Sequence, residues 1–227
     1  MLFRSDGLSM DMDGFARSLD EQKERSRTSS KIKGEGLEEG HVAVLKEGIS
    51  SEFLGYQAHS VAQATTMTVL KDDKVVDTIN AGEAGEAFFD RTPFYAESGG
   101  QMEDEGTVSW PGGKARVTAA KKVKADLFSH TIVVEEGTLK KGQKVDLAID
   151  VERRKSIARN HTATHLLQYA LRQVLGSHVK QSGSLVDKDR LRFDFSHFQA
   201  MDQAEIARVE DIVNEKIMDS VDVSTKE

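Results

Sequence analysis

Cysteine is absent from this sequence of 227 residues. The absence excludes disulfides and thiolate chemistry, and it removes the ligand on which most structural zinc sites depend. Long apolar runs are also missing, since no stretch approaches the roughly 18 consecutive apolar residues of a membrane helix. The first residues show no apolar signal region. We therefore expect a cytoplasmic protein with no membrane contact.

The charge of the chain is unevenly distributed. Its net charge of −7 argues against a protein that binds nucleic acid over its whole surface. Between Arg153 and Arg192, however, there are nine lysines and arginines and only two acids, Asp187 and Asp189. A basic stretch of this kind can contact a phosphate backbone, but it is also typical of an ordinary solvated surface. Charge alone leaves these two interpretations open.

Turn and strand signals divide the chain into three parts. Residues 1–50 predict a helical leader, with one polar helix over 11–29, followed by a linker rich in serine, lysine and glycine. Residues 51–150 contain short alternating strands, including two hairpins with turns at Asp72–Asp73 and Pro111–Gly113. Such closely spaced strands favour a small β-barrel-like domain or a sandwich.

Residues 151–227 predict an α/β domain. A helix over 153–175 ends at Gly176, alternation at 191–195 indicates a half-buried strand, and a capping box at 202–205 begins a last helix. The apolar positions of the first helix are Ala163, Leu166, Leu167, Ala170, Leu171 and Val174. The last helix has an apolar stripe, which we expect to be exposed, at Ile206, Val209 and Ile212.

His161 and His165 stand four residues apart in the predicted helix, so both imidazoles lie on one face. Two histidines at this spacing can bind one metal ion, and zinc is the usual choice. Thr162 occupies the position of the glutamate base in zinc proteases of the HExxH type, which argues against that class. The pair lines either a functional site or a plain solvent face. A zinc site usually needs three protein ligands, and nothing in the spacing identifies a third histidine.

A second candidate is the segment Tyr95–Gln101, in which Gly99 and Gly100 stand between a serine and a glutamine. Adjacent glycines allow a tight turn that can bring backbone amides close to a ligand. The same pattern is common in ordinary turns, so these residues alone leave the role of the segment open.

Four segments together resemble one family, the alanyl-tRNA synthetases. Those at 90–101 and 159–167 resemble the glycine-rich signature and the first zinc half-motif of the family's editing region. Those at 176–184 and 190–197 continue this region in the expected order, and Gly7–Ser26 more loosely resembles the helical segment before it. The resemblance implies an α+β chain. It would hold a small β-barrel-like domain and a two-layer α/β editing domain of the threonyl/alanyl-tRNA synthetase second-additional-domain type.

The resemblance implies that the chain is an internal part of an alanine–tRNA ligase and contributes its editing region. Editing regions of this family hydrolyse the ester that wrongly links serine or glycine to tRNA(Ala), so the aminoacylated 3′ end is the expected partner. By resemblance, His161 and His165 would be zinc ligands, and Gln101 would help to inspect the amino acid. Weaker candidates for contact with the tRNA are Arg153, Arg154, Lys155 and Arg172.

The resemblance also implies what this sequence lacks. The family completes its zinc site with a Cys-x-x-x-His element further along, and its ATP-binding aminoacylation domain lies upstream; this sequence contains neither. We expect that the chain alone does not charge tRNA, and that the rest of a parent protein or a partner chain supplies the remaining zinc ligands. The alternatives are a non-catalytic tRNA(Ala)-binding module, and one half of a split or free-standing editing protein.

Overall fold

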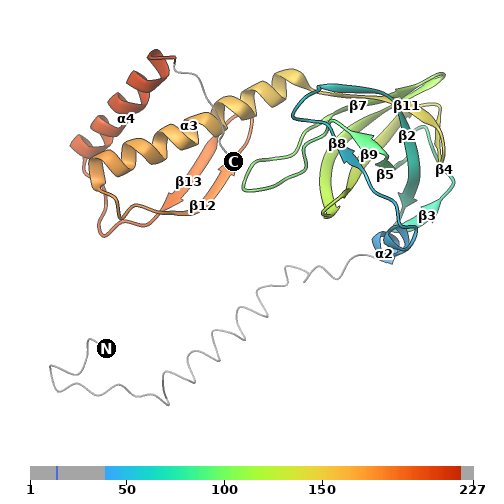
Figure 1. Cartoon of the computed structure of the whole chain (residues 1–227), viewed down its shortest axis with the longest axis horizontal. Coiled ribbons are helices and arrows are strands. Elements are labelled where there is room, and N and C mark those ends of the chain that lie inside the picture. Colours follow the sequence, from blue (N-terminus) through green and yellow to red (C-terminus); the bar gives the residue numbers. More distant parts are fainter. Residues whose placement is uncertain (1–13, 15–38, 221–227) are drawn as a thin grey trace.

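The computed structural model describes Gly14 and residues 39–220. Figure 1 shows a unit of β-strands and a smaller unit of helices and a hairpin, joined by one long helix. The predicted helix over 11–29 lies outside the described residues except for Gly14, so it stays a prediction. Among the described helices, none is both long and apolar enough to cross a membrane.

Six strands of the first unit close into a barrel. Their order is β11–β7–β8–β9–β5–β2, and β2 pairs with β11 to complete the ring. All neighbouring pairs are antiparallel. The strands are β2 Ser60–Lys71, β5 Ala84–Phe89, β7 Gly106–Trp110, β8 Gly113–Lys124, β9 Leu127–Glu136 and β11 Lys144–Ile149. The chain therefore forms a barrel and not a sandwich.

Shorter elements surround the barrel. A hairpin joins β2 to β3, and Asp72 and Asp73 occupy its turn at positive φ, which confirms the predicted turn. A short helix, α2, lies against this turn, and Gly40 N of the helix donates to Asp73 Oδ1 at 2.8 Å. These elements are α2 Glu39–Lys46, β1 Glu52–Phe53, β3 Lys74–Val76, β4 Thr78–Asn80, β6 Arg91–Thr92 and β10 Thr138–Lys140. The sequence pattern had assigned the residues of α2 only to the leader and linker.

The barrel core follows from the alternation of its strands. Successive side chains of a strand point to opposite faces, so β11 buries Val145, Leu147 and Ile149 and exposes Lys144 and Asp146. Each buried aliphatic side chain of this size contributes about 1.5–3 kcal/mol. The barrel is thus a packed and rigid support for the loops that leave it.

The second unit contains two helices and a β-hairpin. The side chain of Asp150 caps the first helix by accepting from Arg153 N at 3.0 Å, and Gly176 ends this helix. Asp202 and Glu205 form the predicted capping box of the last helix. The elements are α3 Val151–Leu175, β12 Gln181–Val186, β13 Leu191–Phe195 and α4 Gln203–Met218. The predicted helices and strand of this unit are therefore confirmed; α3 packs against both strands of the hairpin, and α4 packs against α3 (Figure 1).

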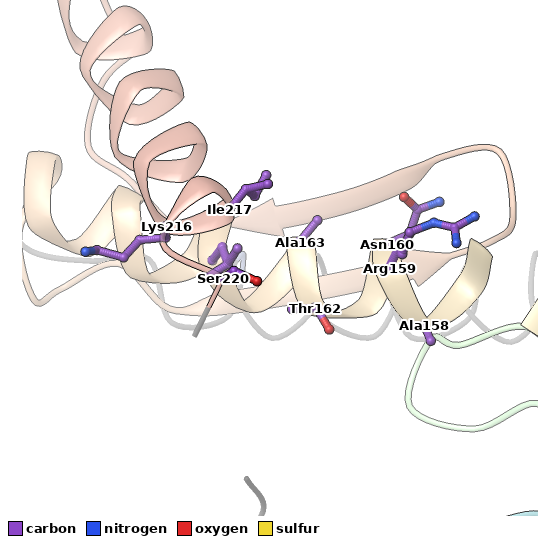
Figure 2. A pocket seen from close by; sticks show the side chains of 9 residues that line it. Ala158, Arg159, Asn160, Thr162, Ala163, Lys216, Ile217 and Ser220 are labelled. Atoms are coloured by element: carbon purple, nitrogen blue, oxygen red, sulfur yellow. The ribbon is translucent and has the colours of Figure 1, made fainter. Parts of the chain in front are cut away.

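The apolar side of α4 packs against α3. Val209 is buried, and the other two members of the stripe that we expected to be exposed are half-buried. That expectation was wrong, because α3 covers the stripe. Exposure begins only near the end of α4, where Ile217 is 54% exposed. Figure 2 shows the open groove beside it, which has a volume of about 640 Å³ and is lined by Ala163 and Leu166 of α3.

Candidate functional site

The histidine pair of α3 is arranged as its spacing predicts. The ring centroids of His161 and His165 are 5.0 Å apart, and the ring planes are inclined by 21°. His161 is partly buried, whereas His165 is exposed. Both imidazoles therefore lie side by side on one face of the helix, with room for a ligand next to His165.

Gln101 of the barrel unit lies against this pair. Its Oε1 is 2.6 Å from Nδ1 of His161. Because an amide oxygen can only accept, Nδ1 carries the ring proton and Nε2 keeps a free lone pair. Burial, followed by the neighbouring His165, lowers the pKa of His161, so its neutral form is favoured at neutral pH. His161 thus presents a nitrogen that can bind a metal ion or accept a proton.

The loop that carries Gln101 crosses from the barrel to the second unit. Gly99 and Gly100 have φ values of 61° and 85°, as in a type I′ turn, and the residues on either side exchange backbone hydrogen bonds. Gly100 O then accepts from Val186 N at 2.7 Å, and Met102 N donates to Val186 O at 2.9 Å. The loop is therefore bound to the edge of β12, and this brings Gln101 to His161.

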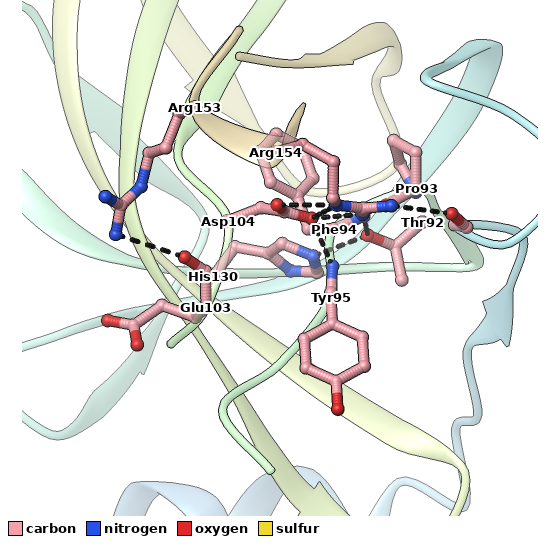
Figure 3. Close-up of polar contacts among 10 residues, drawn as sticks. Thr92, Pro93, Phe94, Tyr95, Glu103, Asp104, His130, Arg153 and Arg154 are labelled. Carbon is pink, nitrogen blue, oxygen red and sulfur yellow. Dashed lines mark hydrogen bonds and ion pairs between the residues drawn. The ribbon is translucent and has the colours of Figure 1, made fainter. Parts of the chain in front are cut away.

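A buried ion pair holds the base of the same loop. Arg154, in the first turn of α3, donates to both carboxylate oxygens of Asp104, with an Nε–Oδ1 distance of 2.8 Å. The same guanidinium donates to the carbonyl oxygens of Gly55 and Pro93 at 2.9 and 3.2 Å. Tyr95 N also donates to Asp104, as Figure 3 shows. One side chain of α3 therefore binds three separate segments of the barrel unit.

The four predicted tRNA contacts differ in their surroundings. Arg153 is 10% exposed and pairs with Asp187 at 3.2 Å, and Arg154 is held within the network just described. Lys155 and Arg172 are exposed. Contact with tRNA stays a prediction for all four residues. Since the guanidinium groups of Arg153 and Arg154 are engaged inside the protein, their observed role is to join the two units.

Comparison with known proteins identifies the family. A family model described as "tRNA synthetases class II (A)" matches residues 1–153. The chain belongs to this family. A curated relative named "Alanine--tRNA ligase", from Acetivibrio thermocellus, is 46% identical over 222 residues. The match covers 97% of this chain and 25% of the relative, so the chain spans about a quarter of the length of that relative. The resemblance to alanyl-tRNA synthetases drawn from the motifs is thereby confirmed.

The donor set of this class II synthetase chain suits half of a zinc site. His161 and His165 provide two imidazoles, which zinc prefers, and the hydrogen bond to Gln101 is of the kind that orients a metal-binding histidine. Across residues 39–220, no cluster of three or more histidine, aspartate and glutamate side chains could hold a metal ion. A complete zinc site would therefore need ligands from beyond this part of the synthetase.

Two features of the site were missed by reasoning from the sequence. Asp104 was not identified, and the ion pair that Arg154 forms with Asp104 was not foreseen. The only signal was an acid close to Gln101 in the sequence. Nothing in the run of acids at 103–105 shows which of them is buried, because the partner lies about 50 residues away.

Replacing Gly100 by alanine should destabilise the synthetase chain more than the same change at Gly99. A Cβ at Gly100 would lie 2.4 Å from the backbone oxygen of Ser184, whereas nothing lies within 4 Å of a Cβ at Gly99. Both residues have positive φ, so each substitution costs about 1 kcal/mol for the backbone. The clash should raise the loss at Gly100 to about 2–3 kcal/mol. Urea unfolding measures both variants, and equal losses would contradict the docking of this loop on β12.

Proposed function

We propose that this chain is the editing part of an alanine–tRNA ligase, which hydrolyses the ester linking serine or glycine wrongly to tRNA(Ala). The contact that supports the proposal is the 2.6 Å approach of Gln101 Oε1 to His161 Nδ1. It joins the glycine-rich loop of the barrel to the histidine pair of α3, so that a polar side chain and two candidate metal ligands share one site. The use of ATP and the charging of tRNA would belong to other parts of the parent protein.

His161 and His165 would hold a zinc ion, and the parent protein or a partner chain would supply the remaining ligands. Bound zinc would polarise the ester carbonyl and activate a water molecule near neutral pH. The contribution of this chain is to keep His161 neutral, through partial burial and the neighbouring His165, and to fix its tautomer through the hydrogen bond of Nδ1 to Gln101. This matters because only the neutral imidazole binds a metal ion.

Gln101 would act on both the histidine and the substrate. Its carbonyl oxygen faces His161, and within the described part of the chain the structure shows no partner for its amide nitrogen. An amide N–H can donate to the hydroxyl of a misplaced serine. A site built to hydrogen-bond a hydroxyl discriminates strongly against a substrate without one, and alanine has none. This contact explains a preference for serine, but not one for glycine.

Zinc binding tests the metal site directly. We expect His165→Ala to weaken zinc binding by at least about tenfold, because one of the two imidazole ligands is lost. The matched control is His59→Ala, which removes an exposed histidine of the barrel unit. Calorimetric titration with zinc at neutral pH gives both affinities. Equal affinities for the two variants would rule out this assignment of the ligands.

Hydrolysis of mischarged tRNA tests the activity in the parent protein. His165→Ala should slow the hydrolysis of seryl-tRNA(Ala) and leave the charging of tRNA with alanine intact, whereas His59→Ala should preserve both. The rate of serine release from purified seryl-tRNA(Ala) is the measurement. Unchanged hydrolysis in the His165 variant would contradict the editing role and favour a non-catalytic tRNA-binding module.

A further inference from the structure

Four aromatic side chains of the barrel unit form a cluster beside the candidate site. Phe53 is at its centre, with ring centroids 5.1 Å from Tyr56, 6.3 Å from Tyr95 and 5.7 Å from Phe128. Phe128 is buried and anchors the cluster, whereas Tyr56 is 83% exposed. Tyr56 is therefore an exposed ring that rests on Phe53, and it offers a flat apolar surface to a ligand.

The cluster is connected to the residues that form the site. Tyr95 begins the loop that ends at Gln101, and its Oη donates to Ser98 O within that loop at 3.4 Å. Gly55, next to Tyr56, accepts from Arg154 Nη1 at 2.9 Å. Figure 3 shows the ring of Tyr95 pointing away from Arg154, outward from the buried ion pair. The cluster therefore lies where the barrel meets the first turn of α3.

The geometry of α3 relates this junction to the histidines. At about 100° per residue, Arg154, His161 and His165 lie on the same side of the helix. Seven residues separate Arg154 from His161, which corresponds to about 10 Å along the helix axis. A ligand that extends along this side of α3 from the histidine pair would reach the cluster within a few nucleotides' length.

One exposed lysine lies next to the aromatic rings. Lys122 Nζ is 5.8 Å from the ring centroid of Phe128, and Lys121 and Lys124 are also exposed at this end of β8, where Lys124 pairs with Asp126 at 3.9 Å. Ala120 O accepts from Glu97 N of the Gln101 loop at 3.4 Å, so these lysines adjoin the loop as well. Aromatic faces combined with lysines are the composition of surfaces that bind single-stranded nucleic acid, where bases stack on the rings and cations meet the phosphates.

We propose that Tyr56, supported by Phe53, stacks a base of the single-stranded 3′ end of an RNA whose last nucleotide lies at His161 and His165. The proposal rests on the editing function proposed above. Lys122 would meet the phosphate backbone of the same strand. The cluster would bind the strand through its bases without distinguishing one base from another, because every base has a face that can stack on an aromatic ring.

Binding of unacylated RNA tests the proposal separately from hydrolysis and zinc. A labelled single-stranded RNA of about eight nucleotides, within the usual site size of such surfaces, is titrated with the protein and followed by fluorescence anisotropy. Tyr56→Ala should weaken binding about tenfold, the effect expected for the loss of one stacked base. A blunt RNA duplex of the same length should show no such difference, since its bases are already stacked inside the helix.

Phe198→Ala is the matched control, because Phe198 is 86% exposed and also rests on another ring, that of His178. It follows β13 and lies away from the barrel, so its loss should change the affinity by less than about twofold. Tyr56→Trp adds a direct readout, since the indole should be quenched by the single strand while the native Trp110 is only 8% exposed. Equal affinities of wild type and Tyr56→Ala, or equal losses in both alanine variants, would overturn the proposal.

Discussion

Replacing Asp104 by alanine should lower the free energy of unfolding by about 3–5 kcal/mol. The change leaves the guanidinium of Arg154 without its partner in a place where the side chain is only 16% exposed. Removing one member of a buried pair is costly, because the remaining charge has lost both water and its counter-charge. Urea unfolding of wild type and variant at neutral pH measures the loss.

Two further variants show whether the uncompensated charge is the cause. The double variant Asp104→Ala/Arg154→Met should be less destabilised than the sum of the single changes, because no lone charge stays buried. Lys155→Met is the control on the same turn of α3, and it breaks only the exposed pair with Glu152. Its effect should stay within about 0.5 kcal/mol. Additive losses in the double variant would contradict the explanation.

The Asp104 variant should also disturb the candidate site. Asp104 accepts from Tyr95 N, so it fixes the start of the loop whose end places Gln101 against His161. Without this anchor we expect the proton of His161 to distribute over both ring nitrogens, which nitrogen NMR of the imidazole detects. An unchanged proton on Nδ1 would show that the contacts of the loop with Val186 are sufficient to position Gln101.

The parts of the fold that the sequence predicted are those fixed by local contacts. α3 has a cap at Asp150 and a stop at Gly176, and the hairpin at Asp72–Asp73 is closed by its own turn. Closure of the barrel depends on the pairing of β2 with β11, for example of Thr65 with Lys144. A pairing between residues so distant leaves no local signal, so the sequence could not decide between a barrel and a sandwich.

Within the candidate site, too, the features fixed by local contacts could be predicted and those that depend on distant contacts could not. The spacing of His161 and His165 sets their shared face through helix geometry alone, so this pair could be derived. The approach of Gln101 depends on a crossing between two units, and only the resemblance to the synthetases suggested it. The pairing of Arg154 with Asp104 was not foreseen, because a count of charges cannot distinguish a solvated arginine from a buried one. Only the position of Asp104 in space decides that question.

The barrel core also contains a buried histidine, His130 of β9. Its Nδ1 donates to Ala87 O at 3.1 Å, so its Nε2 accepts from Thr92 Oγ1 at 2.7 Å, and the rings of Phe89 and Phe94 lie against it. The neutral ring satisfies both of its nitrogens in this arrangement. A charged ring would be buried among aromatic groups without a counter-ion, and burial accordingly lowers the pKa of His130 from about 6.5 to about 4.

Acid should therefore destabilise the protein through His130. Its pKa is lower in the folded state than in the unfolded state, so the unfolded chain binds more protons between pH 6.5 and pH 4. The stabilisation is complete above pH 6.5 and is lost as the pH falls toward 4. The gap between the two pKa values corresponds to a loss of about 3 kcal/mol at pH 4. His161, whose pKa is also lowered, should add a smaller loss of the same sign because it is less buried.

The variant His130→Gln separates this effect from other acid sensitivity. Glutamine does not titrate, so the variant should be less stable than wild type at pH 7 but should lose less stability between pH 6.5 and pH 4.5. Glu86 is a titrating carboxylate of the barrel whose pKa stays below 4.5, because hydrogen bonds from His41 and Ser129 outweigh its burial. Titration of Glu86 therefore affects the stability only below pH 4.5. Urea unfolding of wild type and variant at several pH values gives the pH dependence of the free energy of unfolding for each protein. Equal dependences would show that protonation of His130 does not cause the loss of stability in acid.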